Sequence, residues 1–289
     1  MSLLICVVSA FFWSCFDLTR KLCLKNKINS KIILILFSLF QILIFTIWLV
    51  FDNFFFNIKS YYFIGILLVL INVSSALLFL NSLRLSELSM TIPLLSFTPL
   101  FSAVFSSFLI DETLVTIQYI GIFFIIFGTM ILYSRSLQIS EIFFSITILR
   151  NNIAANYMLL VSLMWSLTPI LDKICLQSAS INIHGFIQSL GMLIFLLLIY
   201  KRGLKNELNI LIKEKKLIII TMLIGVSATI LQFFAVILSY VSIMESIKRS
   251  MGQFGSLFFG KFFFNEKISY QKVFGVTIIS FGIFFILNN

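Results

Sequence analysis

Three charged residues stand close together inside a long apolar stretch of the chain: Glu245, Lys248 and Arg249. At positions i, i+3 and i+4 of a helix they would share one face. A charged group at the centre of a bilayer costs about 2.5–3.5 kcal/mol on insertion scales, so this face should border a wet cavity or a partner. Glu245 offsets one cation, and the remaining positive charge suits a carboxylate or phosphate, which a guanidinium binds through two parallel hydrogen bonds. The alternative is a structural salt bridge.

Two further charged groups stand at the ends of apolar runs. Asp172 and Lys173 end one run on the membrane side where the run with the triad begins, so we expect Asp172 to pair with Lys248 or Arg249 and to form a gate there.

The opposite side carries a matching set, at the end of the first run and the start of the fourth: Asp17, Arg20, Lys21 and Glu87. These side chains are expected to form a second gate. Alternatively, Arg20 and Lys21 simply extend their charged ends to the membrane interface.

Polar and aromatic side chains inside the apolar runs are further binding candidates. Trp13 and Trp165 either stack on a substrate ring or anchor the chain at the membrane interface. Asn72, Asn81 and Gln232 should hydrogen-bond across helices or line a cavity.

The sequence offers no constellation for catalysis. The chain has a single histidine, His184, which gives no basis for proposing a Ser-His-Asp triad. The sequence also lacks a GxxxxGK[ST] loop for binding ATP. The cysteines match neither a metal motif nor a disulfide framework and are expected to be packing residues: Cys6, Cys15, Cys23 and Cys175. We therefore expect no enzyme activity, no cofactor and no metal.

Composition places these residues in a membrane. Of 289 residues, 60% are hydrophobic and 11% charged, whereas ordinary globular chains are nearer half apolar and a quarter charged. A span needs roughly 20 apolar residues. The sequence predicts an all-α integral membrane protein with ten transmembrane helices, near residues 3–24, 32–51, 61–82, 88–109, 115–133, 156–176, 183–200, 217–239, 242–262 and 269–287.

The second half of the chain repeats the first, which predicts two five-helix units at residues 1–134 and 156–289. Because five is odd, the second unit would be inverted in the membrane, an arrangement typical of transporters. The matching pairs are Trp13 with Trp165, Lys21 with Lys173, Asp111-Glu112 with Asn265-Glu266, Gly121 with Gly275 and Gly128 with Gly282. The glycines recur every seven residues and predict packing seams.

These features together resemble the drug/metabolite transporter superfamily in its ten-helix form with two EamA-type repeats. The carrying residues are Trp13, Lys21, Pro99, Leu109-x-x-Glu112, Gly121 and Gly128, then Trp165, Pro169, Lys173, Phe264-x-Glu266, Gly275 and Gly282. The resemblance implies a secondary transporter or exporter of small metabolites, with a central cavity lined by helices one, three, four, six, eight and nine. The sequence departs from the family pattern at one position: Pro99 of the first repeat aligns with Gln253 of the second, so the second repeat lacks this proline. What is assumed about the substrates of other family members therefore transfers poorly to this chain. We include Gln253 among the binding candidates.

The chain has a formal charge of +10, and its basic residues lie mostly in short links between spans. In that position they indicate membrane topology rather than nucleic-acid binding. Lys and Arg concentrate in the odd-numbered links, and the even-numbered links carry little beyond Lys59 and Lys173. The positive-inside rule then places both termini outside, whereas the family resemblance implies both inside. The two expectations conflict.

The sequence thus predicts a multi-pass secondary transporter of a bacterial cytoplasmic membrane that moves a small anionic or zwitterionic metabolite by alternating access. Its expected partners are the substrate, the bilayer and a coupled proton carried by Glu245, Asp17 or Asp172, but no nucleic acid. The sequence does not distinguish a monomer from a homodimer. The alternatives are an exporter of drugs or lipid-linked compounds, and a membrane scaffold whose charged face is buried and inert.

Overall fold

The protein is described here from a computed structural model that covers residues 2–86, 92–133, 152–199 and 208–287. These residues form helices, joined by short links in which Phe56 and Ala179 make an isolated β-bridge. The helices of the first half are α1 (Ser2–Lys25), α2 (Ser30–Phe51), α3 (Ile58–Leu85), the 3-10 helix η1 (Ile92–Phe97), α5 (Thr98–Leu109) and α6 (Thr116–Tyr133). Those of the second half are α8 (Ile153–Leu176), α9 (Ile181–Ile199), α10 (Leu208–Lys213), α11 (Lys215–Leu238), α12 (Val241–Phe264) and α13 (Tyr270–Leu287).

Most predicted spans begin and end within a few residues of a described helix, but the fourth differs. Instead of one α-helix over 88–109, the described part starts with η1 and continues as α5. Pro99 stands in the first turn of α5, where its missing N–H breaks no helical hydrogen bond. The short helix α10 was not predicted.

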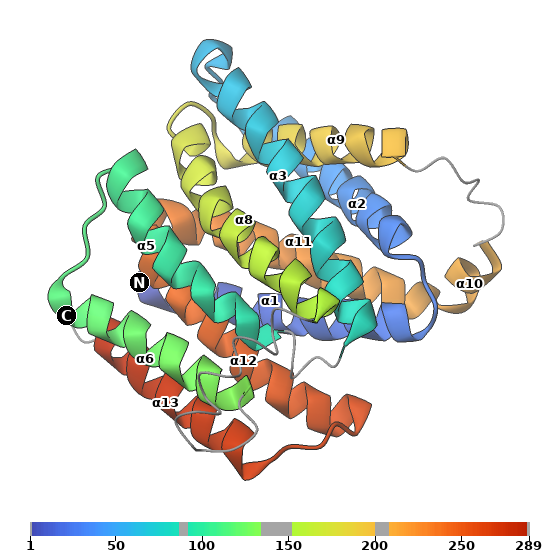
Figure 1. Ribbon diagram of the computed structural model, residues 1–289. Coiled ribbons are helices and arrows are strands. Elements are labelled where there is room, and N and C mark those ends of the chain that lie inside the picture. The colour runs from blue at the N-terminus through green and yellow to red at the C-terminus, as the bar shows by residue number, and fades with distance from the viewer. Residues whose placement is uncertain (1, 87–91, 134–151, 200–207, 288–289) are drawn as a thin grey trace.

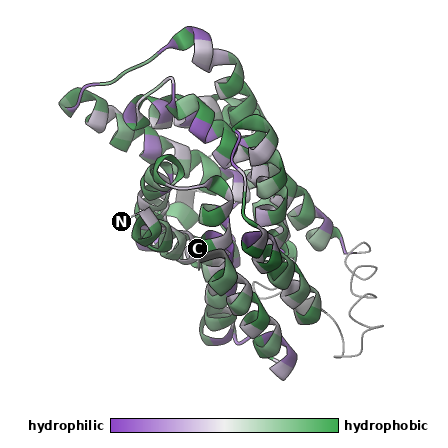
Figure 2. Ribbon diagram, turned by 90° about the vertical axis from the view of Figure 1, so that its left-hand side faces the viewer, coloured by the Kyte–Doolittle hydropathy of each residue, from purple (hydrophilic) through white to green (hydrophobic). Residues whose placement is uncertain are grey.

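Within the described residues, six helices are long and apolar enough to cross a membrane: α1, α2, α3, α8, α9 and α11. Their outer faces carry large apolar side chains, such as Phe63 and Leu198, which are 70% and 67% exposed. Figure 2 shows hydrophobic residues along nearly all of the helices, with hydrophilic ones collected at links and in a few interior positions. Such a surface suits lipid, because outward-facing side chains need no contact with water there.

Packing between the two halves is reciprocal (Figure 1). Helix α1 packs against α11 and α12, while its repeat counterpart α8 packs against α3 and α5. Helix α2 packs against α9, and α6 against α13. Helices of each half are therefore held mainly by helices of the other half.

The pairing of α6 with α13 depends on glycine. A Cβ atom at Gly128 would lie 2.7 Å from the carbonyl oxygen of Gly275, and one at Gly282 would lie 2.5 Å from that of Gly121. Both distances are shorter than any real Cβ contact, so only glycine allows the two backbones to approach this closely. The packing seams predicted from the seven-residue glycine spacing are confirmed at this contact.

Candidate functional site

A cavity of about 140 Å³ lies where α1, α2, α3, η1, α8, α9, α11 and α12 meet. The family resemblance implied that six of these helices line a central cavity, and α2 and α9 line it as well. An engineered cavity of about 150 Å³ accepts benzene, so this space suits a small molecule. Unlike that apolar cavity, it is bordered by charged side chains: Asp17, Arg20, Asp172, Lys248 and Arg249.

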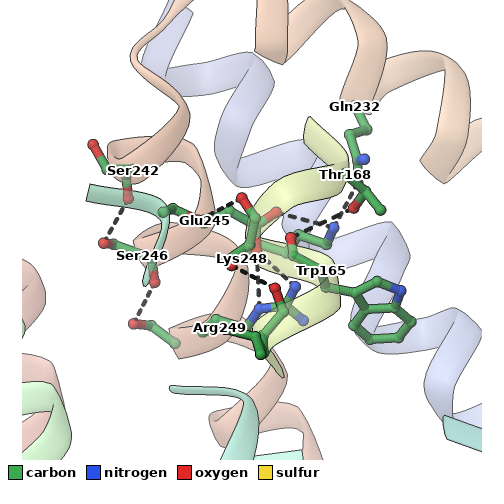
Figure 3. A network of polar contacts seen from close by, with 12 residues as sticks. Trp165, Thr168, Gln232, Ser242, Glu245, Ser246, Lys248 and Arg249 are labelled. Carbon is green, nitrogen blue, oxygen red and sulfur yellow. Dashed lines mark hydrogen bonds and ion pairs between the residues drawn. The ribbon is translucent and has the colours of Figure 1, made fainter. Parts of the chain in front are cut away.

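On the α12 wall, one carboxylate holds two cations (Figure 3). The Oε2 atom of Glu245 accepts hydrogen bonds from Nε and Nη2 of Arg249 at 2.9 and 2.6 Å, and its Oε1 atom lies 3.3 Å from Nζ of Lys248. Glu245 is fully buried behind the cavity wall, whereas both cations line the cavity. The predicted shared face is confirmed, and it leaves one positive charge in excess.

Two tryptophans cover these cations. Nζ of Lys248 lies 4.6 Å from the ring centroid of Trp13 and also donates to Gln232 on α11 at 2.6 Å. The guanidinium of Arg249 lies 5.2 Å from the ring centroid of Trp165. Both tryptophans line the cavity. Their ring faces attract the cations electrostatically, so each helps to hold a charge in an otherwise apolar interior.

The α1 wall carries a neutralised pair. The carboxylate of Asp17 accepts a hydrogen bond from Arg20 one helical turn away. The Arg20 guanidinium also lies between two aromatic rings, 4.2 Å from the centroid of Phe16 and 4.4 Å from that of Phe79. Glu87, predicted to join this group, lies outside the described residues.

The α8 wall differs from expectation. Asp172 does not pair with Lys248 or Arg249 in the described structure; its Oδ1 atom lies 3.1 Å from Nε2 of His184 on α9. The expected ion pair is absent because Glu245, on the same helix as both cations, already occupies them. Asp172 therefore lines the same cavity as the two α12 cations without pairing with either of them.

Two predicted lysines lie away from the cavity and close helix ends. Lys21 donates to the carbonyl oxygens of Leu83 and Ser86, where α3 ends. Lys173 donates to the carbonyl oxygen of Ser239, where α11 ends, at 2.8 Å. A cation at a helix C-terminus is stabilised by the helix dipole and the unpaired carbonyls.

Glu112 completes this second junction. Its Oε1 atom accepts from Nζ of Lys173 at 2.6 Å, and its Oε2 atom accepts from the backbone N–H of Val241 at 2.8 Å, the first residue of α12. Glu112 therefore has a structural role, and its contacts join the end of α5 to α8 and α12.

The cavity thus brings together nine of the gating and binding candidates named from the sequence: Trp13, Asp17, Arg20, Asn72, Trp165, Asp172, Gln232, Lys248 and Arg249. Glu245 lies directly behind it, and Lys21 and Lys173 hold helix ends. Gln253 is fully buried on α12 but, like Asn81 of α3, lies outside the cavity lining.

Several lining residues were missed as site candidates, among them Gln41, Gln188, Ser189 and Thr229. Their only signal in the sequence is polarity within an apolar run. Three lining side chains keep a buried polar atom without a hydrogen-bond partner in the described part of the chain: Trp13 Nε1, Arg20 Nε and Gln188 Oε1. Buried polar atoms are normally paired, so these are groups that a polar ligand can engage.

A helical membrane bundle with a charged internal cavity built by both halves defines a class of protein, the polytopic membrane transporters. Residues 1–134 and 152–288 match the EamA-like transporter family. The chain therefore belongs to this family and is a multi-pass membrane transporter of the drug/metabolite transporter superfamily. The family consists of transporters, not enzymes.

The fold recurs among solved structures. One crystal structure of a protein aligns with a TM-score of 0.62 over 97% of this chain and 95% of its own length, at 12% identity. At that identity the likeness concerns the fold alone. No curated protein matches this chain.

Proposed function

We propose that this transporter moves a small anionic or zwitterionic metabolite across a bacterial cytoplasmic membrane by alternating access, as a secondary transporter. The observation that carries the proposal is the α12 wall, where Lys248 and Arg249 border the cavity and share the single carboxylate of Glu245. The excess positive charge suits a substrate carboxylate or phosphate, because a charge-assisted hydrogen bond is about twice as strong as a neutral one.

The remaining cavity groups support a small polar substrate. Trp13 Nε1 and Arg20 Nε are unpartnered donors among the described residues, and Gln188 Oε1 is an unpartnered acceptor. A substrate with several polar groups would satisfy them, which an apolar drug or a lipid chain would not. A cationic drug would in addition be repelled by the excess charge on α12.

The proposal includes an architecture of ten transmembrane helices in two inverted repeats, residues 1–134 and 156–289. Reciprocal packing of α1 and α8, and the mutual glycine contacts of α6 and α13, support it. The repeat-related lysines give a further argument, since Lys21 closes the end of α3 and Lys173 the end of its counterpart α11. Two such halves can rock around a site between them.

The test is a thermal-shift screen of the purified protein against small carboxylates, phosphates and amino acids, with Arg249→Ala in parallel. A ligand that binds only the folded state stabilises it by about 2.7 kcal/mol at a hundredfold excess over its dissociation constant. We expect an acidic or zwitterionic compound to raise the melting temperature of the wild type and not that of Arg249→Ala. Flux of that compound into proteoliposomes then establishes transport.

Two further variants separate binding from folding. Arg249→Lys keeps the charge and loses the planar fork, so binding should weaken while the protein remains folded. Lys261→Ala removes an exposed cation from the same helix and should leave both melting and binding unchanged. If a well-folded wild type responds to no compound, while Arg249→Ala only melts earlier, the triad is a structural salt bridge and the substrate proposal fails.

A further inference from the structure

A buried chain of hydrogen bonds runs from a cavity carboxylate to the chain's single histidine and beyond it. His184 is fully buried, with Nε2 3.1 Å from Oδ1 of Asp172 and Nδ1 2.8 Å from Oη of Tyr61 on α3. Nε2 of Gln188 lies 3.1 Å both from this Tyr61 oxygen and from the carbonyl oxygen of Gly65. The chain therefore links α3, α9 and α8 in one connected network.

The carbonyl of Gly65 fixes the orientation of the Gln188 amide. A carbonyl only accepts, so the amide nitrogen of Gln188 must face it, and the second N–H of that amide points to Tyr61. The Tyr61 oxygen thus accepts from Gln188, which leaves its hydroxyl proton available for Nδ1 of His184. In that arrangement Nδ1 is an acceptor, and the ring carries its proton on Nε2, which donates to Asp172.

Among the described carboxylates at the cavity, Asp172 is the one whose partner is neither a lysine nor an arginine. Asp17 is paired with Arg20, and Glu245 with Lys248 and Arg249. Protonating Asp17 or Glu245 would leave a buried cation without its counter-ion, which is strongly destabilising. Protonating Asp172 breaks no ion pair within the described residues.

Aromatic rings enclose His184. Its ring lies 4.9 Å from that of Phe233 on α11 and 5.7 Å from that of Tyr61 on α3. A second ring proton would need the Tyr61 hydroxyl to turn its hydrogen away from Nδ1. The other charged residues that line the cavity are Asp17 and Arg20 of α1 and Lys248 and Arg249 of α12, while Lys173, next to Asp172, is paired with Glu112.

We propose that Asp172 is the proton-binding site of this transporter, with Tyr61, His184 and Gln188 as positioning residues that hold its carboxylate at the cavity. The proton adds to the carboxylate oxygen that His184 does not contact, which gives a neutral acid, while the Nε2–H bond to Oδ1 remains. The inference rests on the proposed function, since this proton removes a negative charge from the cavity that Lys248 and Arg249 also line. Proton and substrate occupancy are coupled through that charge.

Because the chain has one histidine, nitrogen-15 NMR of ring-labelled histidine reports on this site alone. The protein is labelled with ring-¹⁵N histidine, purified through a tag without histidine and reconstituted in lipid. We expect the Nε2–H tautomer at neutral pH. Acidification should shift both ring signals in one transition without forming imidazolium, as Asp172 takes up its proton.

Three variants make the experiment decisive. Asp172→Asn keeps an oxygen for the Nε2–H bond and should abolish the transition, whereas Asp111→Asn, the same change at an exposed residue, should leave it unchanged. Tyr61→Phe removes the donor to Nδ1 and should give a mixture of tautomers. An Nδ1–H tautomer in the wild type, the absence of a transition while the protein stays folded, or an unaltered transition in Asp172→Asn would each overturn the proposal. None of these readouts needs a substrate, so a negative metabolite screen is a separate result.

Discussion

Glu245 shows how one buried carboxylate can place two cations at a cavity without being part of its lining. The side chains of Lys248 and Arg249 follow it by three and four residues, and each makes a second contact, with Trp13 and Trp165 respectively. Desolvation of three charges is costly, and their mutual attraction, these ring contacts and the hydrogen bond from Lys248 to Gln232 offset it. The arrangement therefore depends on every member being present.

Glu245→Gln is expected to destabilise the protein severely. The substitution keeps the shape of the side chain but leaves two neighbouring cations buried without an anion. Removing one partner of a buried pair costs about 3–5 kcal/mol, which should appear as a large fall in melting temperature in detergent.

Asp111→Asn is the matched control for this variant. It makes the same chemical change at an exposed residue whose backbone φ of 55° asparagine tolerates. We expect little change in its melting temperature. Equal melting temperatures for the two variants would show that the triad does not hold the helix in place.

The shared face of this triad could be predicted from the sequence because it depends only on helix periodicity. The pairing of Asp172 with His184 could not. Those residues stand twelve apart, on two helices joined by a turn, and Tyr61 stands 123 residues from His184. Such contacts are set by how α3, α8 and α9 pack, and no spacing rule within one helix contains that information.

At the scale of elements, the paired helices α6 and α13 lie side by side at one edge of the bundle (Figure 1). They contribute no residue to the cavity. The backbones of the two helices come close together at Gly128 and Gly282, because glycine has no side chain to hold them apart.

Gly128→Ala is expected to destabilise the α6–α13 pair. The added methyl group would meet backbone atoms that cannot move aside, and overpacking of this kind costs about 1–3 kcal/mol. The measurement is the melting temperature of the purified variant.

Gly252→Ala provides the control in another helix. Its Cβ would meet only Ile92 Cγ2, at 3.5 Å, which is an ordinary contact, and alanine favours the helix over glycine. We expect no loss of stability there. A Gly128→Ala protein as stable as Gly252→Ala would show that the two helices can separate without cost.

Element positions were predicted well because apolar runs of about 20 residues are a strong signal. The exception is the fourth span, where the described chain is a 3-10 turn followed by α5. Apolar composition does not distinguish these conformations, and Pro99 is compatible with either. The reciprocal packing of the halves was anticipated only through the repeated motifs.

At the scale of the whole molecule, basic links gather at one end. Asn26, after α1, donates to Glu214, before α11, at 2.9 Å, and Lys25 lies 5.4 Å from the ring of Phe264, where α12 ends. Helix α1 begins, and α13 ends, on the other side of the bundle (Figure 1). The positive-inside rule places the basic end in the cytoplasm and both termini outside.

We expect Asn289→Cys to react with an impermeant thiol reagent in intact cells, in a chain whose native cysteines are replaced by alanine. Lys216→Cys, at the exposed basic end, should react only after permeabilisation. The reverse pattern would establish the orientation that the family resemblance implied. Reaction of both positions from the same side would contradict the three spans expected between them, near residues 217–239, 242–262 and 269–287.

The mutual contact of α6 and α13 also bears on ancestry. Gly128 meets the backbone at Gly275, and Gly282 meets it at Gly121, so each helix offers the other the same surface. Self-complementary surfaces of this kind are what two identical subunits present across a twofold axis. On the two-repeat architecture proposed above, a protein of half this length, inserted in both orientations, could have assembled through this seam as a dimer before gene duplication joined its two copies.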